Sequence, residues 1–114
     1  MSSEDIQKKL IKLLFAIKKR PLLYLTRRSI LSLSDFYGGF CSALMAYMPN
    51  DRGWIINEFG SFIRDKHPEL EYLDLFNILY EVSDHDEAKA FDLFFEEFES
   101  FLTKEGIEIP CFDK

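Results

Sequence analysis

Apolar residues recur at helical spacing along most of the chain, so the pattern predicts a series of helices. The first lies in residues 4–20, where acids stand near the start and lysines near the end, as the helix dipole favours. Pro21 ends this helix, because proline removes a backbone donor and clashes with the preceding turn. Its apolar face consists of Ile6, Leu10, Leu13, Leu14 and Ile17.

A second helix follows the connector "PLLYLTRRS" and runs to about Met48, with Ser29 or Ser32 as its N-cap. Gly38 and Gly39 lie inside it. A glycine costs about 1 kcal/mol relative to alanine in an exposed helix. We therefore expect a neighbouring helix to pack closely against the backbone here, with a simple break of the helix as the alternative.

Two further helices are predicted between the turn "MPNDRG" and residue 82. Asp51 is expected to cap the third helix, and Pro68 to end it. The fourth lies in residues 71–82, where the apolar set is Tyr72, Leu75, Phe76 and Leu79.

The fifth helix is predicted to begin at Ser83 or Asp84 and to end before Gly106. Residues 84–102 hold seven acids and five phenylalanines. On a helical wheel one broad side is apolar and should face the core, and it comprises Ala88, Phe91, Phe94, Phe95, Phe98, Phe101 and Leu102. The opposite side carries Asp92, Glu96, Glu99 and Thr103, a stripe that is more often a solvated face than a recognition surface.

Five helices with short connections predict an all-α, single-domain bundle over residues 1–114, with a short irregular tail at 104–114. No stretch alternates with period two long enough to build a sheet. No apolar run reaches the roughly 18–20 residues that cross a bilayer, and the start does not resemble a signal peptide. We expect a cytoplasmic protein without a membrane partner.

The charge is unevenly distributed along the chain. The net charge is −6; residues 1–57 carry nine basic and four acidic residues (+5), and residues 58–114 carry five and sixteen (−11). The acidic half argues against a nucleic-acid binder, although a fold can intermix the two halves in space.

Candidates for catalysis or metal binding are few. His85 stands between Asp84 and Asp86, but adjacent residues at a helix start point in different directions, and no second histidine follows at i+4. Cys41 and Cys111 lack metal-ligand spacing, and free thiols are expected. There is no glycine-rich phosphate loop. We expect no catalytic residues, no metal and no cofactor, and therefore no enzyme.

The segment "KKRPLLYLTRRSILSLSDFYGGF" resembles a pattern near the start of a family of small helical bacterial immunity proteins from toxin–immunity systems. The pattern reads Arg-Pro-x-Met-Tyr-Leu-Gly, then Ser-Ile-x-x-Leu-x-x-Phe-x-x-Gly-Tyr/Phe. Leu23 and Thr26 depart from it, standing for methionine and glycine. "AFDLFFEEFESFL" is similar to the closing helix of that family. The matching residues are Arg20, Pro21, Tyr24, Leu25, Ser29, Ile30, Leu33, Phe36, Gly39 and Phe40.

The resemblance implies stoichiometric neutralisation of a cognate toxin domain, of the contact-dependent growth inhibition type or a related one. A nuclease is the expected class of toxin, because an acidic surface can fill its basic cleft. The acids expected to contact the toxin are Asp84, Asp86, Glu87, Asp92, Glu96 and Glu99. Trp54 or Tyr47 would add an aromatic anchor.

Two alternatives stay open. One is a helical adaptor or self-associating protein whose acids only keep it in solution, and the other is a binder of a small ligand between the aromatic helices. The adaptor alternative predicts a stable homodimer, and whether the free protein dimerises stays open.

Overall fold

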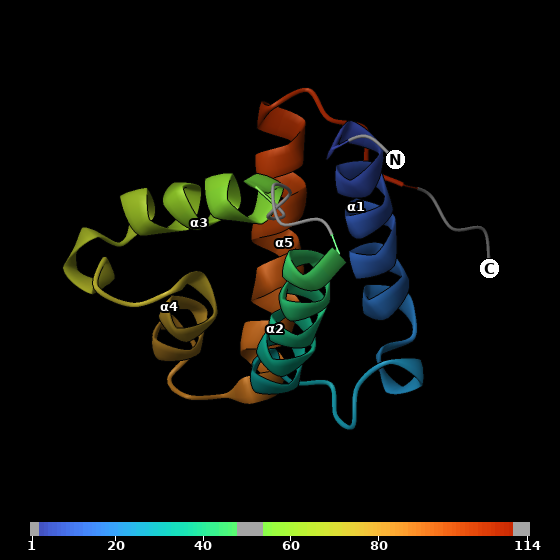
Figure 1. Cartoon of the computed structure of the whole chain (residues 1–114). Coiled ribbons are helices and arrows are strands. Elements are labelled where there is room, and N and C mark those ends of the chain that lie inside the picture. The colour runs from blue at the N-terminus through green and yellow to red at the C-terminus, as the bar shows by residue number, and fades with distance from the viewer. Residues whose placement is uncertain (1–2, 48–53, 111–114) are drawn as a thin grey trace.

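The computed structural model describes residues 3–47 and 54–110, and within them the chain folds into five α-helices and two 3-10 turns, with no strand (Figure 1). The predicted all-α class is confirmed. In chain order the elements are α1 (Ser3–Lys19), η1 (Pro21–Leu23), α2 (Ile30–Tyr47), α3 (Trp54–Lys66), η2 (Pro68–Leu70), α4 (Leu75–Val82) and α5 (Glu87–Lys104).

Helix α5 lies at the centre of the bundle and packs against α2, α3 and α4 (Figure 1). Its phenylalanines are buried in a single hydrophobic core, as its sequence pattern predicts. The Phe59 ring of α3 anchors that core, with ring centroids 5.4 Å from Phe94, 5.0 Å from Phe98 and 5.5 Å from Phe101. Aromatic pairs at these separations stabilise a core beyond the burial of their area.

Both predicted proline stops are confirmed. Helix α1 ends at Lys19, and Pro21 begins the 3-10 turn η1; α3 ends at Lys66, and Pro68 begins η2. Of the two candidate caps of α2, Ser29 is the one used, because its Oγ accepts the amide of Leu31 at 3.1 Å.

Helix α4 begins later than predicted. Asp74 is its N-cap and accepts the amide of Asn77 at 2.9 Å, so the first helical residue is Leu75. Tyr72 lies before the helix, and 78% of its surface is exposed. The helical spacing of Tyr72 relative to Leu75 and Phe76 therefore predicts the start of α4 too early. The capping aspartate has a local hydrogen bond that outweighs the spacing of one aromatic residue.

The start of α5 was also predicted too early. Asp84 and His85 adopt left-handed backbone angles, with φ of 56° and 64°, which interrupt the helix. Asp86 follows in extended conformation and caps α5 by accepting the amide of Lys89 at 3.0 Å. Ser83, one of the predicted starts, instead ends α4 and is buried.

The glycine pair of α2 has no tightly packed neighbour. Gly38 and Gly39 are both exposed, and apart from their chain neighbours and the adjacent backbone of α2 no described atom lies within 4 Å of a Cβ placed on either. The prediction of a helix packed closely against this backbone is wrong. The buried residues of α2, such as Ile30 and Leu33, lie nearer its beginning.

The tail follows the prediction as far as it is described. Glu105 caps α5, Gly106 has a φ of 72°, and residues 107–110 have no regular structure, although Ile107 and Ile109 pack against the core.

Some predictions fall on parts of the chain that the structure does not describe: the cap Asp51, the thiol Cys111 and the side chains of Tyr47 and Trp54. None of the described helices combines the length and the apolar character that a bilayer span requires.

Candidate functional site

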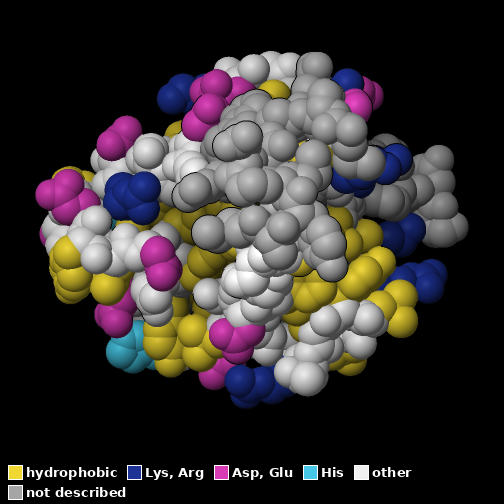
Figure 2. All heavy atoms as spheres, in the orientation of Figure 1, with side chains coloured by type: hydrophobic (Ala, Val, Ile, Leu, Met, Phe, Trp, Pro, Cys, Tyr) yellow, Lys and Arg dark blue, Asp and Glu magenta, His cyan; other side chains and the backbone are white. Residues whose placement is uncertain are grey.

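The uneven charge of the sequence is visible on the surface. Lys and Arg side chains gather along the edge of the molecule formed by α1, while Asp and Glu are spread over the side formed by α3 and α4 (Figure 2). What the acidic stripe of α5 can bind depends on which basic residues it already contacts.

Three acids of the predicted toxin-binding set are paired with basic residues from the first part of the chain. The Lys18 ammonium donates to Glu99, and the Arg28 guanidinium donates to Asp92. These partners are 81 and 64 residues apart in sequence, so the sequence pattern gave no sign of them. Asp92 is exposed as expected, and Glu99 is half-buried.

Glu87 forms the third contact of this kind. A guanidinium nitrogen of Arg27 lies 3.1 Å from its Oε1, and the hydroxyl of the buried Ser29 donates to the same oxygen at 2.5 Å. The acids Glu87, Asp92 and Glu99 therefore line a seam along which α5 meets α1 and the connector to α2. They do not form a free acidic stripe.

The other three predicted contact acids are placed differently from one another. Asp86 is the helix cap. Asp84 is exposed in the left-handed turn, and Glu96 is exposed on α5 without an ion pair to any described residue. The six acids thus differ in their partners: three are ion-paired, one caps a helix, and two are exposed without an ion pair to a described residue.

His85 has local partners. Its ring stacks on Tyr80 with centroids 4.7 Å apart, and its Nε2 lies 3.0 Å from Oε2 of Glu81. Within the described ranges, no group of three or more His, Cys, Asp or Glu side chains is arranged to hold a metal ion.

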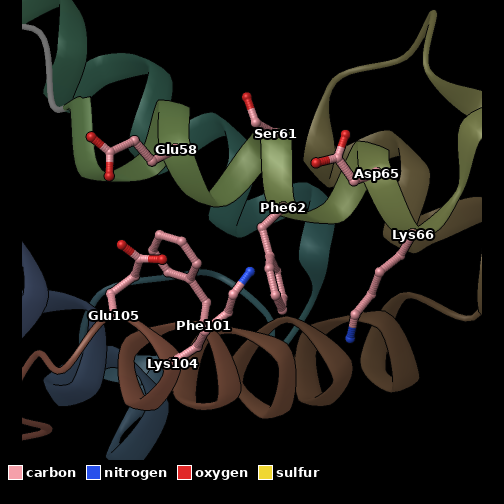
Figure 3. A pocket seen from close by; sticks show the side chains of 8 residues that line it. All are labelled: Glu58, Ser61, Phe62, Asp65, Lys66, Phe101, Lys104 and Glu105. Atoms are coloured by element: carbon pink, nitrogen blue, oxygen red, sulfur yellow. The ribbon is translucent and has the colours of Figure 1, made fainter.

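A groove between α3 and α5, which the sequence reasoning missed, brings a second set of acids together (Figure 3). It encloses about 400 Å³, and its floor is formed by Phe62 and Phe101, whose ring centroids are 5.4 Å apart. The polar residues around this floor are Glu58, Ser61, Asp65, Lys66, Lys104 and Glu105. We call this the α3–α5 groove.

The carboxylates of the α3–α5 groove lack the partners that the α5 acids have. None of Glu58, Asp65 and Glu105 forms an ion pair with a described residue. Glu58 from α3 and Glu105 from the end of α5 stand at the same end of the groove, on opposite walls (Figure 3). The spacing of Glu58, Ser61 and Asp65, at i, i+3 and i+7, was the available sequence signal, because it places them on one helical face.

The two lysines of the groove are held against its floor. The Lys66 ammonium lies 4.7 Å from the Phe62 ring centroid and donates to Glu97 at 2.6 Å. The Lys104 ammonium lies 5.4 Å from the same centroid. Both contacts are cation–π interactions, with the two ammonium groups on opposite sides of the Phe62 ring (Figure 3). The groove carboxylates lie farther from this ring.

The residues that resemble the immunity family divide into a buried and an exposed group. Leu25, Ser29, Ile30 and Leu33 are buried, as expected of structural residues. The turn η1 is different, because the residues there project outward. The exposed fractions are 72% for Leu22, 70% for Leu23 and 40% for Tyr24.

Tyr37 of α2 is a half-buried titratable group outside the α3–α5 groove. Burial raises the pKa of its phenol well above the ordinary value, and a hydrogen bond with Cys41 adds to the increase. Its ring packs against Phe76 of α4 with centroids 5.8 Å apart. Tyr37 is half-buried in a protein contact, which is typical of a core residue.

The chain matches no protein-family model, no curated protein and no solved structure.

Proposed function

We propose that this chain is an immunity protein that binds a bacterial toxin domain and neutralises it stoichiometrically, using the α3–α5 groove as its contact face. The observation that carries the proposal is a set of three carboxylates around an aromatic floor, Glu58, Asp65 and Glu105, which form no ion pair with any described residue. The resemblance of residues 18–40 to the immunity family supplies the class of partner.

The groove suits a basic partner surface. A lysine or arginine entering between Glu58 and Glu105 would meet a carboxylate on each wall. A nuclease presents such side chains in the cleft that binds phosphates. Occupying that cleft excludes the nucleic acid, and inhibition requires no chemistry from this chain.

The ion pairs of α5 favour the groove over the predicted stripe. A carboxylate beside its own guanidinium or ammonium contributes little to the field at a distance, whereas an unpaired carboxylate contributes fully. Electrostatic steering of a basic partner should therefore depend more on Glu58 and Glu105 than on Asp92 or Glu99.

The test begins with co-expression of this chain and the polypeptide encoded immediately upstream, with capture and growth rescue as readouts. The groove variant is Glu58→Lys with Glu105→Lys. Glu96→Lys tests the predicted stripe without breaking an ion pair between described residues. Asp35→Lys, at an exposed position of α2 outside the groove, reverses one charge as Glu96→Lys does and is its matched control.

We expect the groove variant to lower the association rate by about tenfold or more at low salt, and Asp35→Lys to leave it nearly unchanged. If Glu96→Lys slowed association and the groove variant did not, the interface would lie on the exposed side of α5. Failure of the unmodified chain both to capture the upstream polypeptide and to rescue growth would contradict the immunity proposal and favour an adaptor.

A further inference from the structure

The turn η1 exposes two adjacent leucines at one end of the bundle. Leu22 and Leu23 are each about two-thirds or more exposed, and a shallow hollow of about 510 Å³ lies beside them. The hollow is lined by Arg20, Pro21, Leu22, Leu23 and Arg28. Its wall is thus apolar in the middle and cationic at the margins.

The surroundings of η1 are basic over a long stretch of chain. Residues 6–34 contain eight Lys or Arg and no Asp or Glu, although the molecule as a whole is acidic. Helix α1, which leads into η1, exposes Lys8, Lys9, Lys12 and Lys19. Figure 2 shows basic side chains along this edge of the molecule, with apolar surface at its lower end.

Not all of these cations are available to a partner. Lys18, Arg27 and Arg28 already contact Glu99, Glu87 and Asp92 of α5. Arg20 forms no ion pair with a described residue, and the same holds for the exposed α1 lysines Lys8, Lys9 and Lys12. Arg20 therefore leaves positive charge beside the leucines, and the three lysines extend it along α1.

The backbone of η1 is suited to an apolar environment. Pro21 has no amide hydrogen, the amide of Leu23 donates to the Arg20 carbonyl at 3.1 Å, and the amide of Leu25 donates to the Pro21 carbonyl at 2.8 Å. Tyr24 also donates to Pro21, at 3.1 Å. Because these three donors are satisfied inside the turn, they add no desolvation cost when the turn leaves water.

We propose that η1 and the lysine face of α1 form a peripheral docking surface for an anionic lipid bilayer. Leu22 and Leu23 enter the boundary between headgroups and acyl chains, while Arg20 and the α1 lysines remain at the level of the lipid phosphates. Two leucines and a few cations give weak, reversible binding that depends on salt.

A bilayer fits this surface better than a protein partner does. A specific protein interface carries about one hydrogen bond per 100–200 Å² and needs groups that orient it. The lining side chains of the hollow are proline, leucine and arginine, so only the guanidiniums can direct a polar contact. A bilayer needs only apolar side chains for its hydrocarbon and cations for its phosphates, and the surface at η1 supplies both.

The test is flotation of the full-length chain with two kinds of vesicle: phosphatidylcholine alone, and phosphatidylcholine with about one-third phosphatidylglycerol, chosen to supply the negative potential. The tip variant is Leu22→Ser with Leu23→Ser. Tyr72→Ser is the control, because it removes an exposed apolar residue from a different part of the molecule. Thermal unfolding shows whether each variant folds.

We expect binding to the anionic vesicles only, weakening as salt rises, and a decrease of at least about tenfold in the tip variant. Tyr72→Ser should bind like the unmodified chain. No binding to anionic vesicles, equal binding to both kinds, or unchanged binding by a folded tip variant would each overturn the proposal. The assay contains no toxin, so its outcome is independent of the proposed immunity function.

Discussion

The hydroxyl of Ser29 donates to Oε1 of Glu87 at 2.5 Å and thereby joins the first turn of α2 to the first turn of α5. Ser29 is 1% exposed. Its hydroxyl oxygen also accepts a hydrogen bond from the Leu31 amide, and this bond caps α2. One small side chain thus serves as a helix cap and as a tertiary contact to a carboxylate.

Ser29→Ala should destabilise the fold by about 2 kcal/mol, because it removes an N-cap and leaves a half-buried carboxylate short of a donor. Urea unfolding measures the loss. Ser42→Ala, on the exposed side of the same helix, should change stability by less than about 0.5 kcal/mol. Equal effects from the two variants would show that the Ser29 contacts contribute little.

Gly38→Ala and Gly39→Ala should each stabilise the protein by about 0.5–1 kcal/mol, because both glycines are exposed in a helix and have room for a methyl group. Gly106→Ala is the opposite case, since its φ of 72° disfavours a side chain and should make the variant less stable. The unfolding midpoints in urea give all three values. A destabilised Gly38→Ala would reveal a close neighbour.

Asp92→Asn should cost at most about 1 kcal/mol, although it breaks the contact with Arg28. Both side chains are about half exposed, so water and ions screen the pair. The difference in unfolding free energy between the variant and the unmodified chain should shrink toward zero near 1 M salt. A large loss that persists at high salt would mean that the pair is structurally essential.

Tyr37 should make the fold sensitive to alkali. Burial raises the pKa of its phenol, so above about pH 10 the unfolded chain loses this proton while the folded chain keeps it. This contribution to stability is complete below pH 10 and declines as pH rises, by about 1.4 kcal/mol per unit. Compared with Tyr37→Phe, the unmodified chain should lose stability progressively as pH rises above about 10. If the unfolding free energies of the two proteins changed with pH in the same way, this account would be contradicted.

Phe59→Ala should be far more damaging than Phe62→Ala. The fully buried Phe59 contacts three phenylalanines of α5, and its loss would leave a cavity costing about 3–5 kcal/mol. Phe62 lies in the open α3–α5 groove and is only half-buried. Its replacement should cost clearly less in urea unfolding and should act mainly on toxin capture.

Much of the fold was predictable because its causes are local. Helical spacing of apolar residues identified the core face of α5, and Pro21 and Pro68 ended helices where proline chemistry requires. The starts of α4 and α5 were wrong because several capping residues competed in sequence, and Asp74 and Asp86 were chosen by backbone geometry that the pattern does not contain.

The site was harder to predict because charge pairing is a property of the folded chain. The helical-wheel pattern of α5 correctly predicts that Asp92 and Glu99 lie away from the phenylalanines. It contains no information on Arg28 and Lys18, which the fold brings beside these acids. The α3–α5 groove depends on two helices far apart in sequence. The expectation of no membrane partner rested on the lack of a long apolar run, which excludes a spanning helix but says nothing about a short exposed turn such as η1.

The central position of α5 also affects how the protein is made. Of the five helices, α5 is the last to leave the ribosome, yet it supplies the phenylalanines that α2, α3 and α4 pack against. Until residues 87–104 emerge, the apolar faces of the earlier helices have no permanent partner and are open to chaperones. Productive folding therefore waits until α5 has been translated, and a nascent chain stalled before Glu87 should be captured or degraded rather than fold.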